Sequence, residues 1–117
     1  MSAGENAVQD KRGQERVDVS GIVRVVDQHT GRDIGKLVNI SEEGIMSLGY
    51  HPIPENSIFQ LSLEFGTEED EKKPILIGVE SLWCRSSNNE KQYWSGFYII
   101  DISDQDKERI RNLINKP

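Results

Sequence analysis

The chain has 117 residues, a length that suits one ordinary domain with its own hydrophobic core. Its formal net charge of −6 at pH 7 argues against a surface for polymeric nucleic acid or anionic membranes, because neither attracts an acidic protein. A single cysteine, Cys84, excludes an internal disulfide and predicts a reducing compartment. No segment is apolar enough for a signal core or a membrane span, so we expect a cytoplasmic protein without direct membrane insertion.

The N-terminal part divides into a leader and a basic arm. Residues 1–10 are small or polar and lack periodicity, which predicts a flexible leader before a domain over residues 11–117. Residues 11–16 form the arm, and their local charge is +2. The charged residues of the arm are Lys11, Arg12, Arg16 and the single acidic Glu15. An anionic ligand would find its favourable charge there.

Six segments have the composition or the two-residue period of β-strands. The clearest is Ile58–Phe65, in which apolar and polar residues alternate. Within the fifth segment, alternation is expected to place Trp83 on the same face as Ile77, Val79 and Ser81. The predicted strands are residues 17–26 with an interruption at Gly21, residues 34–40 with a bulge at Gly35, and residues 45–48, 58–65, 74–84 and 93–100.

The last segment has the period of a helix. Ser103 is a suitable N-cap, and Ile110, Leu113 and Ile114 form an apolar stripe, which predicts a helix over about residues 104–115. Strands followed by one terminal helix predict a mostly β fold. We expect a small antiparallel barrel of about six strands, closed by that helix.

Two short motifs carry the chemistry of the chain. Arg12 and Arg16 can each present a planar fork of donors to phosphate oxygens or to the O6/N7 edge of guanine. Asn39, Ser41 and Gly44 offer an amide, a hydroxyl and a site of close backbone approach. Without a ligand, the arginines would be a solvated pair, and the second motif would be a turn with Gly44 at positive φ. We expect the role in the turn to be real as well.

The pattern Arg12-x-x-x-Arg16 followed by Asn39-x-Ser41-x-x-Gly44 resembles the PilZ domain family, bacterial receptors for cyclic di-GMP. Trp83 and the strand with Gly96 also fall where similar proteins carry aromatic residues and a glycine. The resemblance implies a Greek-key-like barrel. It implies that cyclic di-GMP binds Arg12, Arg16, Asn39, Ser41 and Gly44, with further contributions from Lys11, Gly96 and Trp83.

The resemblance also implies a receptor rather than an enzyme, with no catalytic residue, metal site or cofactor. Binding would order the arm and signal through a protein partner in trans, with an output in motility, biofilm, exopolysaccharide or virulence. Asn39 stands where many similar proteins have aspartate; it keeps one acceptor and adds a donor. Lys11 stands where similar proteins often carry arginine, so the number of nucleotides bound per chain stays open.

Three alternatives are weighed against this interpretation. A PilZ-like adaptor would dock on a protein without nucleotide; some similar proteins have lost the arginines, whereas this chain keeps them. An oligonucleotide-binding barrel needs a basic and aromatic face, which the acidic balance disfavours. An enzyme would use His29, His51 or Cys84, but no nucleophile or metal-ligand spacing surrounds them.

Overall fold

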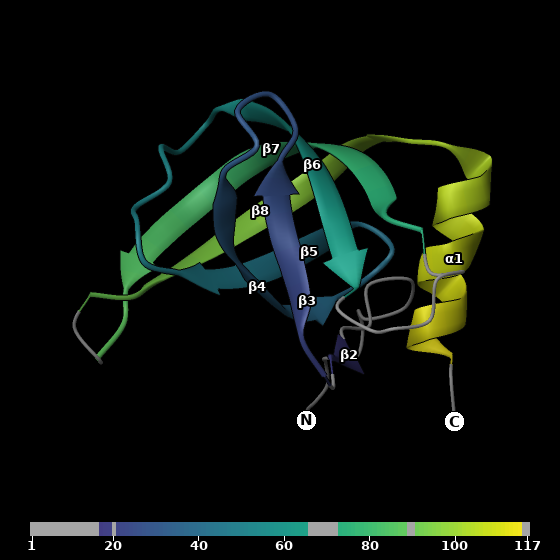
Figure 1. The fold of residues 1–117 in the computed structure, drawn as a ribbon, viewed down its shortest axis with the longest axis horizontal. Helices are drawn as coiled ribbons and strands as arrows, with labels where there is room; N and C mark the ends of the chain where they lie inside the picture. The colour runs from purple at the N-terminus through teal and green to yellow at the C-terminus, as the bar shows by residue number, and fades with distance from the viewer. Residues whose placement is uncertain (1–16, 20, 66–72, 89–90, 116–117) are drawn as a thin grey trace, which may run out of the picture.

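The computed structural model describes residues 17–19, 21–65, 73–88 and 91–115 of the chain. Within them, six strands pair antiparallel in the order β4, β3, β6, β7, β8, β5, and β5 returns to β4, so the sheet closes into a barrel (Figure 1). The predicted mostly β fold, a barrel with a C-terminal helix, is confirmed. The elements are β2 (Val17–Asp18), β3 (Val23–Asp27), β4 (Asp33–Ile40), β5 (Gly44–Gly49), β6 (Ile58–Phe65), β7 (Ile75–Ser86), β8 (Tyr93–Ile102) and α1 (Asp104–Ile114).

The barrel interior is filled by aliphatic side chains from alternate strand positions, among which Val25, Leu61, Leu63 and Val79 are 0% exposed. Helix α1 stands beside one end of the barrel (Figure 1). Its Ile110 is also 0% exposed and belongs to the same core. The helix therefore closes the core at that end.

Local signals place the helix and one close strand crossing as predicted. The Ser103 hydroxyl accepts a hydrogen bond from the Asp106 amide at 3.1 Å, which caps α1. Gly35 has φ 150° at the irregularity between β3 and β4. A Cβ at Gly35 would lie 2.6 Å from the carbonyl oxygen of Leu48 in β5, so β4 and β5 approach this closely only because residue 35 is glycine.

Two bulges interrupt the pairing of β7 with β8. Leu82 is an extra residue in β7, between the Ser81–Phe97 and Trp83–Gly96 pairs. Ile100 is an extra residue in β8. An extra residue reverses the alternation of faces. Trp83 therefore lies on the opposite face from Ser81, and the prediction of a shared face was wrong because the hydrophobic pattern of β7 does not reveal a bulge.

The boundaries of five predicted strands differ from the prediction, those of β4 by one residue at one end and those of β5 by one residue at each end. The first predicted strand is two strands, because Gly21 has φ 81° and separates β2 from β3. Strand β7 continues to Ser86 and β8 to Ile102, two residues beyond the predicted ends in each case. Pairing between these strands extends to both added ends, through the Ser86–Tyr93 and Ile77–Ile102 pairs.

Candidate functional site

The turn between β4 and β5 is built by Ser41. Its hydroxyl accepts hydrogen bonds from the amides of Glu43 (3.2 Å) and Gly44 (3.1 Å) and donates to the Gly44 carbonyl at 3.3 Å. The residue is only 3% exposed. One donor and two acceptor positions exhaust a hydroxyl, so Ser41 shapes the turn rather than presenting a free group to solvent.

Gly44 is required for a different reason from the one predicted. It does not adopt the left-handed conformation, since the described glycines with positive φ are Gly21, Gly31 and Gly35. A Cβ at Gly44 would instead lie 2.5 Å from the Phe97 carbonyl oxygen of β8. The prediction of positive φ was wrong, because the need for glycine comes from a strand crossing.

Asn39 begins a row of side chains across the outer face of the barrel. It is opposite Met46, Met46 is opposite Gly96, and Gly96 is opposite Trp83, so the row crosses β4, β5, β8 and β7. Directly opposed residues share a face. The row thus brings together three residues predicted from sequence, Asn39, Gly96 and Trp83, from three separate parts of the chain.

Trp83 lies on the backbone of Gly96. Any Cβ at Gly96 would collide with the indole ring, so the glycine leaves the space that the ring occupies. The Arg85 guanidinium carbon lies 5.5 Å from the centroid of the Trp83 ring, within cation–π distance. This end of the row therefore combines an aromatic ring with a planar cation.

A second row runs beside the first and was not predicted as part of the site. It joins Lys36, Leu48, Trp94 and Arg85 in direct register across the same four strands. Lys36 and Arg85 are exposed at its two ends. Together the rows form a face with two tryptophans, a methionine and two cations, which we call the aromatic face. Only the register between strands brings these residues together, and the sequence alone does not reveal that register.

The arm enters the described structure at the edge of this face. Val17 is opposite Ile40 and Asp18 is opposite Asn39, so β2 lies along the end of β4 that leads into the Ser41–Gly44 turn. Lys11, Arg12 and Arg16 lie outside the described residues. Their predicted part in binding stays a prediction.

The PilZ domain family model matches residues 10–116, nearly the whole chain and both motifs. The chain belongs to this family. No curated protein matches the sequence. Among solved structures, this PilZ domain is similar to the inhibitor of motility MotI/DgrA of Bacillus subtilis, with a TM-score of 0.69 and 17% identity over 92% of this chain and 53% of that chain. It therefore spans about half of the length of MotI.

A second similar structure is the PilZ domain of YcgR from Escherichia coli with c-di-GMP. The TM-score is 0.65, with 12% identity over 90% of this chain and 89% of that chain. At these low sequence identities, the similarity to both structures shows a shared fold only.

The turn of this PilZ domain is tied to its terminal helix. Arg111 Nε of α1 donates to Glu42 Oε1 at 3.2 Å, across 69 residues of sequence. This hydrogen bond to Glu42, with the charge of the same carboxylate, raises the pKa of the Arg111 guanidinium above its ordinary value. The pair is partly exposed, so screening by solvent limits its contribution to stability.

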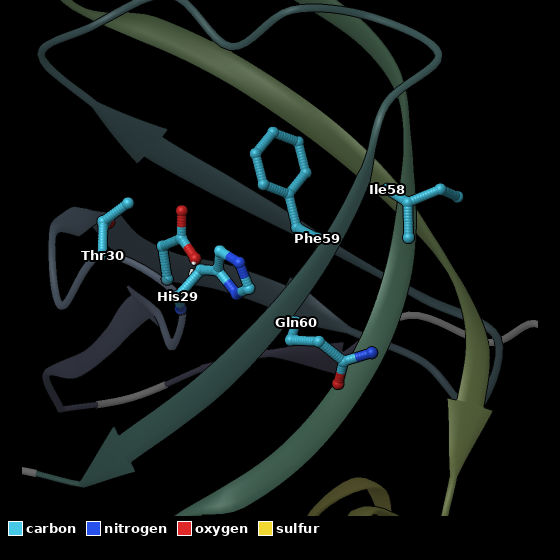
Figure 2. A pocket seen from close by; sticks show the side chains of 6 residues that line it. His29, Thr30, Ile58, Phe59 and Gln60 are labelled. Atoms are coloured by element: carbon cyan, nitrogen blue, oxygen red, sulfur yellow. Dashed lines mark hydrogen bonds between the residues drawn. The ribbon is translucent and has the colours of Figure 1, made fainter.

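A cavity of about 310 Å³ lies away from the aromatic face, between the turn that joins β3 to β4 and strand β6. In Figure 2, Ile58, Phe59 and Gln60 extend from β6, and His29 and Thr30 lie across from them on the turn. None of the residues predicted to bind nucleotide lines it. It is therefore a separate hollow of the PilZ domain.

The described residues contain neither a cluster suited to a metal ion nor a helix suited to crossing a membrane. No group of three or more histidine, cysteine, aspartate or glutamate residues there is placed to hold a metal ion. No helix in the described part of the chain has the length and apolar character needed to cross a membrane.

Proposed function

We propose that this PilZ domain is a cytoplasmic receptor for cyclic di-GMP that binds the nucleotide across the aromatic face and the basic arm. The observation that carries the proposal is the register row from Asn39 to Trp83, which gathers distant motif residues beside the strand that follows the arm. The similar domain of YcgR is a structure with c-di-GMP, and MotI is an inhibitor of motility, which supports the same ligand and a motility output.

The aromatic face suits a guanine base. The Trp83 ring and the Arg85 guanidinium offer planar groups for stacking, and stacking of a base on an aromatic side chain contributes about 1–3 kcal/mol. Asn39 supplies amide hydrogen-bonding groups at the opposite end of the row. Ser41 and Gly44 serve this site through the turn, since their groups hold β4, β5 and β8 in register.

In this proposal, the arm binds the phosphates of the ligand. Arg12 lies five residues before Val17, and an extended chain spans at most about 3.5 Å per residue, so its backbone stays within about 18 Å of β2. Both arginines can therefore reach over the aromatic face. Each can hold a phosphate with a forked pair of hydrogen bonds.

The energies of ordering and binding are of the same size. Fixing a residue costs about 1–2 kcal/mol, so about five arm residues cost about 5–10 kcal/mol. About four charge-assisted hydrogen bonds return about 6–12 kcal/mol. Ordering the arm is thus feasible only with the ligand bound. The receptor catalyses nothing; it presents an altered surface to a protein partner in trans, with an output in motility or biofilm formation.

The test is an isothermal titration of cyclic di-GMP into the full chain and into an Arg12→Ala, Arg16→Ala variant. We expect saturable binding at about micromolar Kd, which corresponds to about 8 kcal/mol, and its loss in the variant. The stoichiometry then answers whether one or two nucleotides bind.

A charge-matched control removes two cations elsewhere, Arg32 of the β3–β4 turn and Lys107 of α1, both by alanine substitution. This control should keep the affinity of the unchanged chain. Equal affinity in all three proteins would show that the arm does not contribute to nucleotide binding. No saturable heat in the unchanged chain, even at high ligand, would overturn the receptor function.

A further inference from the structure

A second surface on the barrel has the character of a protein docking site. Residues Gly44, Tyr98, Glu80 and Ile58 lie in one register row across β5, β8, β7 and β6. Ile58 is 62% exposed and Tyr98 is 46% exposed, so large apolar groups flank Glu80 on both sides. This row lies two positions along β5 and β8 from the row of Met46 and Gly96, about 7 Å away.

The two bulges of the β7–β8 pair add to this surface. The extra residue of each bulge is an exposed branched aliphatic residue. Leu82 of β7 is 47% exposed and Ile100 of β8 is 48% exposed. A bulge leaves its extra residue outside the ladder and can aim its side chain outward. Two bulges in one strand pair that both expose an aliphatic side chain beside the same row indicate a surface shaped for contact. We call Ile58, Leu82, Tyr98 and Ile100 around Glu80 the bulge patch.

On β6, β7 and β8, the charged residues nearest the bulge patch are acidic. Glu80 lies at its centre, Asp101 follows Ile100, and the Glu43 carbonyl accepts the Ile99 amide at 2.8 Å, which fixes a third acidic residue beside β8. Strands β6 and β8 contain no lysine or arginine. In β7, Arg85 is the sole basic residue, and it belongs to the aromatic face. Exposed apolar groups among carboxylates complement an apolar surface that carries cations.

We propose that the bulge patch docks a basic amphipathic segment of a partner protein. A second copy of this chain fits poorly, because a two-fold contact through the patch would bring Glu80 and Asp101 of both copies together. Next to Ile58, the cavity of about 310 Å³ gives the segment room for one side chain, and Asp27 in its lining adds another carboxylate. Figure 2 shows Ile58 together with the other residues that line this cavity. A signalling role for the bulge patch rests on the receptor function proposed above, whereas the docking itself needs no nucleotide.

The test uses a synthetic peptide of about 18 residues, long enough for a helix, with leucine on one face and lysine on the other. It is titrated without nucleotide into the isotopically labelled full chain, and amide chemical shifts are followed by NMR. We expect saturable shifts centred on Ile58, Glu80, Leu82, Tyr98 and Ile100. A leucine and glutamate peptide of the same pattern should leave these amides unchanged.

Variants locate the contact. Leu82→Ser with Ile100→Ser should weaken peptide binding by about tenfold, the loss expected for central apolar contacts. Both residues are unpaired and exposed, so their replacement spares the core. Glu80→Gln should weaken binding and reduce its salt dependence. The matched control is Ile22→Ser, at a residue that is 61% exposed and far in sequence from the patch; it should bind as the unchanged chain does.

Three outcomes would overturn the proposal. The first is a set of chemical shift changes spread over other faces of the barrel. The second is peptide affinity in the Leu82/Ile100 and Glu80 variants equal to that of the unchanged chain. The third is a concentration-dependent dimer that the Leu82/Ile100 variant abolishes. The nucleotide titration is separate, so the docking proposal and the receptor proposal can fail independently.

Discussion

The Ser41 hydroxyl has all of its hydrogen-bonding positions engaged within the β4–β5 turn. Its replacement by alanine leaves the amides of Glu43 and Gly44 without that acceptor, and the Gly44 hydrogen bond is buried. An unsatisfied buried polar group costs about 1–3 kcal/mol. We therefore expect Ser41→Ala to lower the free energy of unfolding by that amount, measured by urea denaturation.

The effect on ligand binding separates two roles of Ser41. If the hydroxyl acts through the turn, Ser41→Thr should restore most of the stability, and affinity for cyclic di-GMP should follow stability across the variants. A large loss of affinity in a variant of unchanged stability would mean that the hydroxyl contacts the ligand directly. The buried Ser47, at 1% exposure on the inner face of β5, offers a control for general loss of a buried hydroxyl.

The motif residues could be predicted from sequence because their types and spacing are visible in it. Their physical roles were only partly predictable. The need for glycine at position 44 depends on the Phe97 carbonyl, which comes from a strand 53 residues later. Likewise, Arg85 and Lys36 join the aromatic face only through register. Spacing along the chain identifies the residues, whereas pairing between strands decides what surrounds them.

The hairpin of β3 and β4 is held by an exposed, forked ion pair. Arg24 donates to both carboxylate oxygens of Asp33, at 2.7 and 2.8 Å, and the Gly35 amide donates to the same carboxylate at 3.0 Å. The hydrogen bond from Arg24 is the main cause that lowers the pKa of Asp33 below its ordinary 3.8. The contribution to stability is therefore present above about pH 4 and is lost as the pH falls through the lowered pKa.

Removal of this pair gives a pH-dependent prediction. The side chains are 40% and 46% exposed, so solvent screening limits the effect, and we expect Asp33→Asn to destabilise the chain by less than about 1 kcal/mol at pH 7. The difference from the unchanged chain should shrink below about pH 4, as followed by denaturant unfolding at several pH values. A double-mutant cycle with Arg24→Gln isolates the pair. A difference that grows on acidification would contradict the assignment.

At the scale of elements, the alternation of β6 predicted its bounds, because Ile58–Phe65 has one face in the core and contains no bulge. The same reasoning misplaced Trp83, because Leu82 adds one residue to β7. Bulges depend on how two strands fit around a closed barrel. Each strand sequence alone therefore lacks the information, and the patch that the bulges create was invisible before the structure.

At the scale of the molecule, the arm is joined to the barrel through β2, the shortest of the described strands. Strand β2 has two paired residues, and the Val19 amide donates to the Val38 carbonyl at 3.1 Å just beyond them. Short edge pairing opens readily, so this amide should exchange its hydrogen quickly in the free chain. We expect cyclic di-GMP to slow that exchange, because an ordered arm would hold β2 against β4.

Amides of β6 and β7 provide the internal reference, since both strands pair on either side within the closed sheet. Under conditions of local opening, their exchange should change little on addition of the nucleotide. The measurement is hydrogen exchange followed by NMR, with the Arg12/Arg16 variant as the control. Slowing confined to β6 and β7, with Val19 unaffected, would contradict coupling between ligand and arm.

Closure of the sheet also determines how this molecule can associate with others. Among the described residues, every barrel strand has a neighbour on both sides, and the sheet ends at the two-residue β2. Much of the strand backbone is therefore already paired, which limits edge-to-edge association through the barrel. Recognition can then use side chains on the curved outer surface, where substitutions can change the binding partner while the backbone hydrogen bonds of the barrel stay intact.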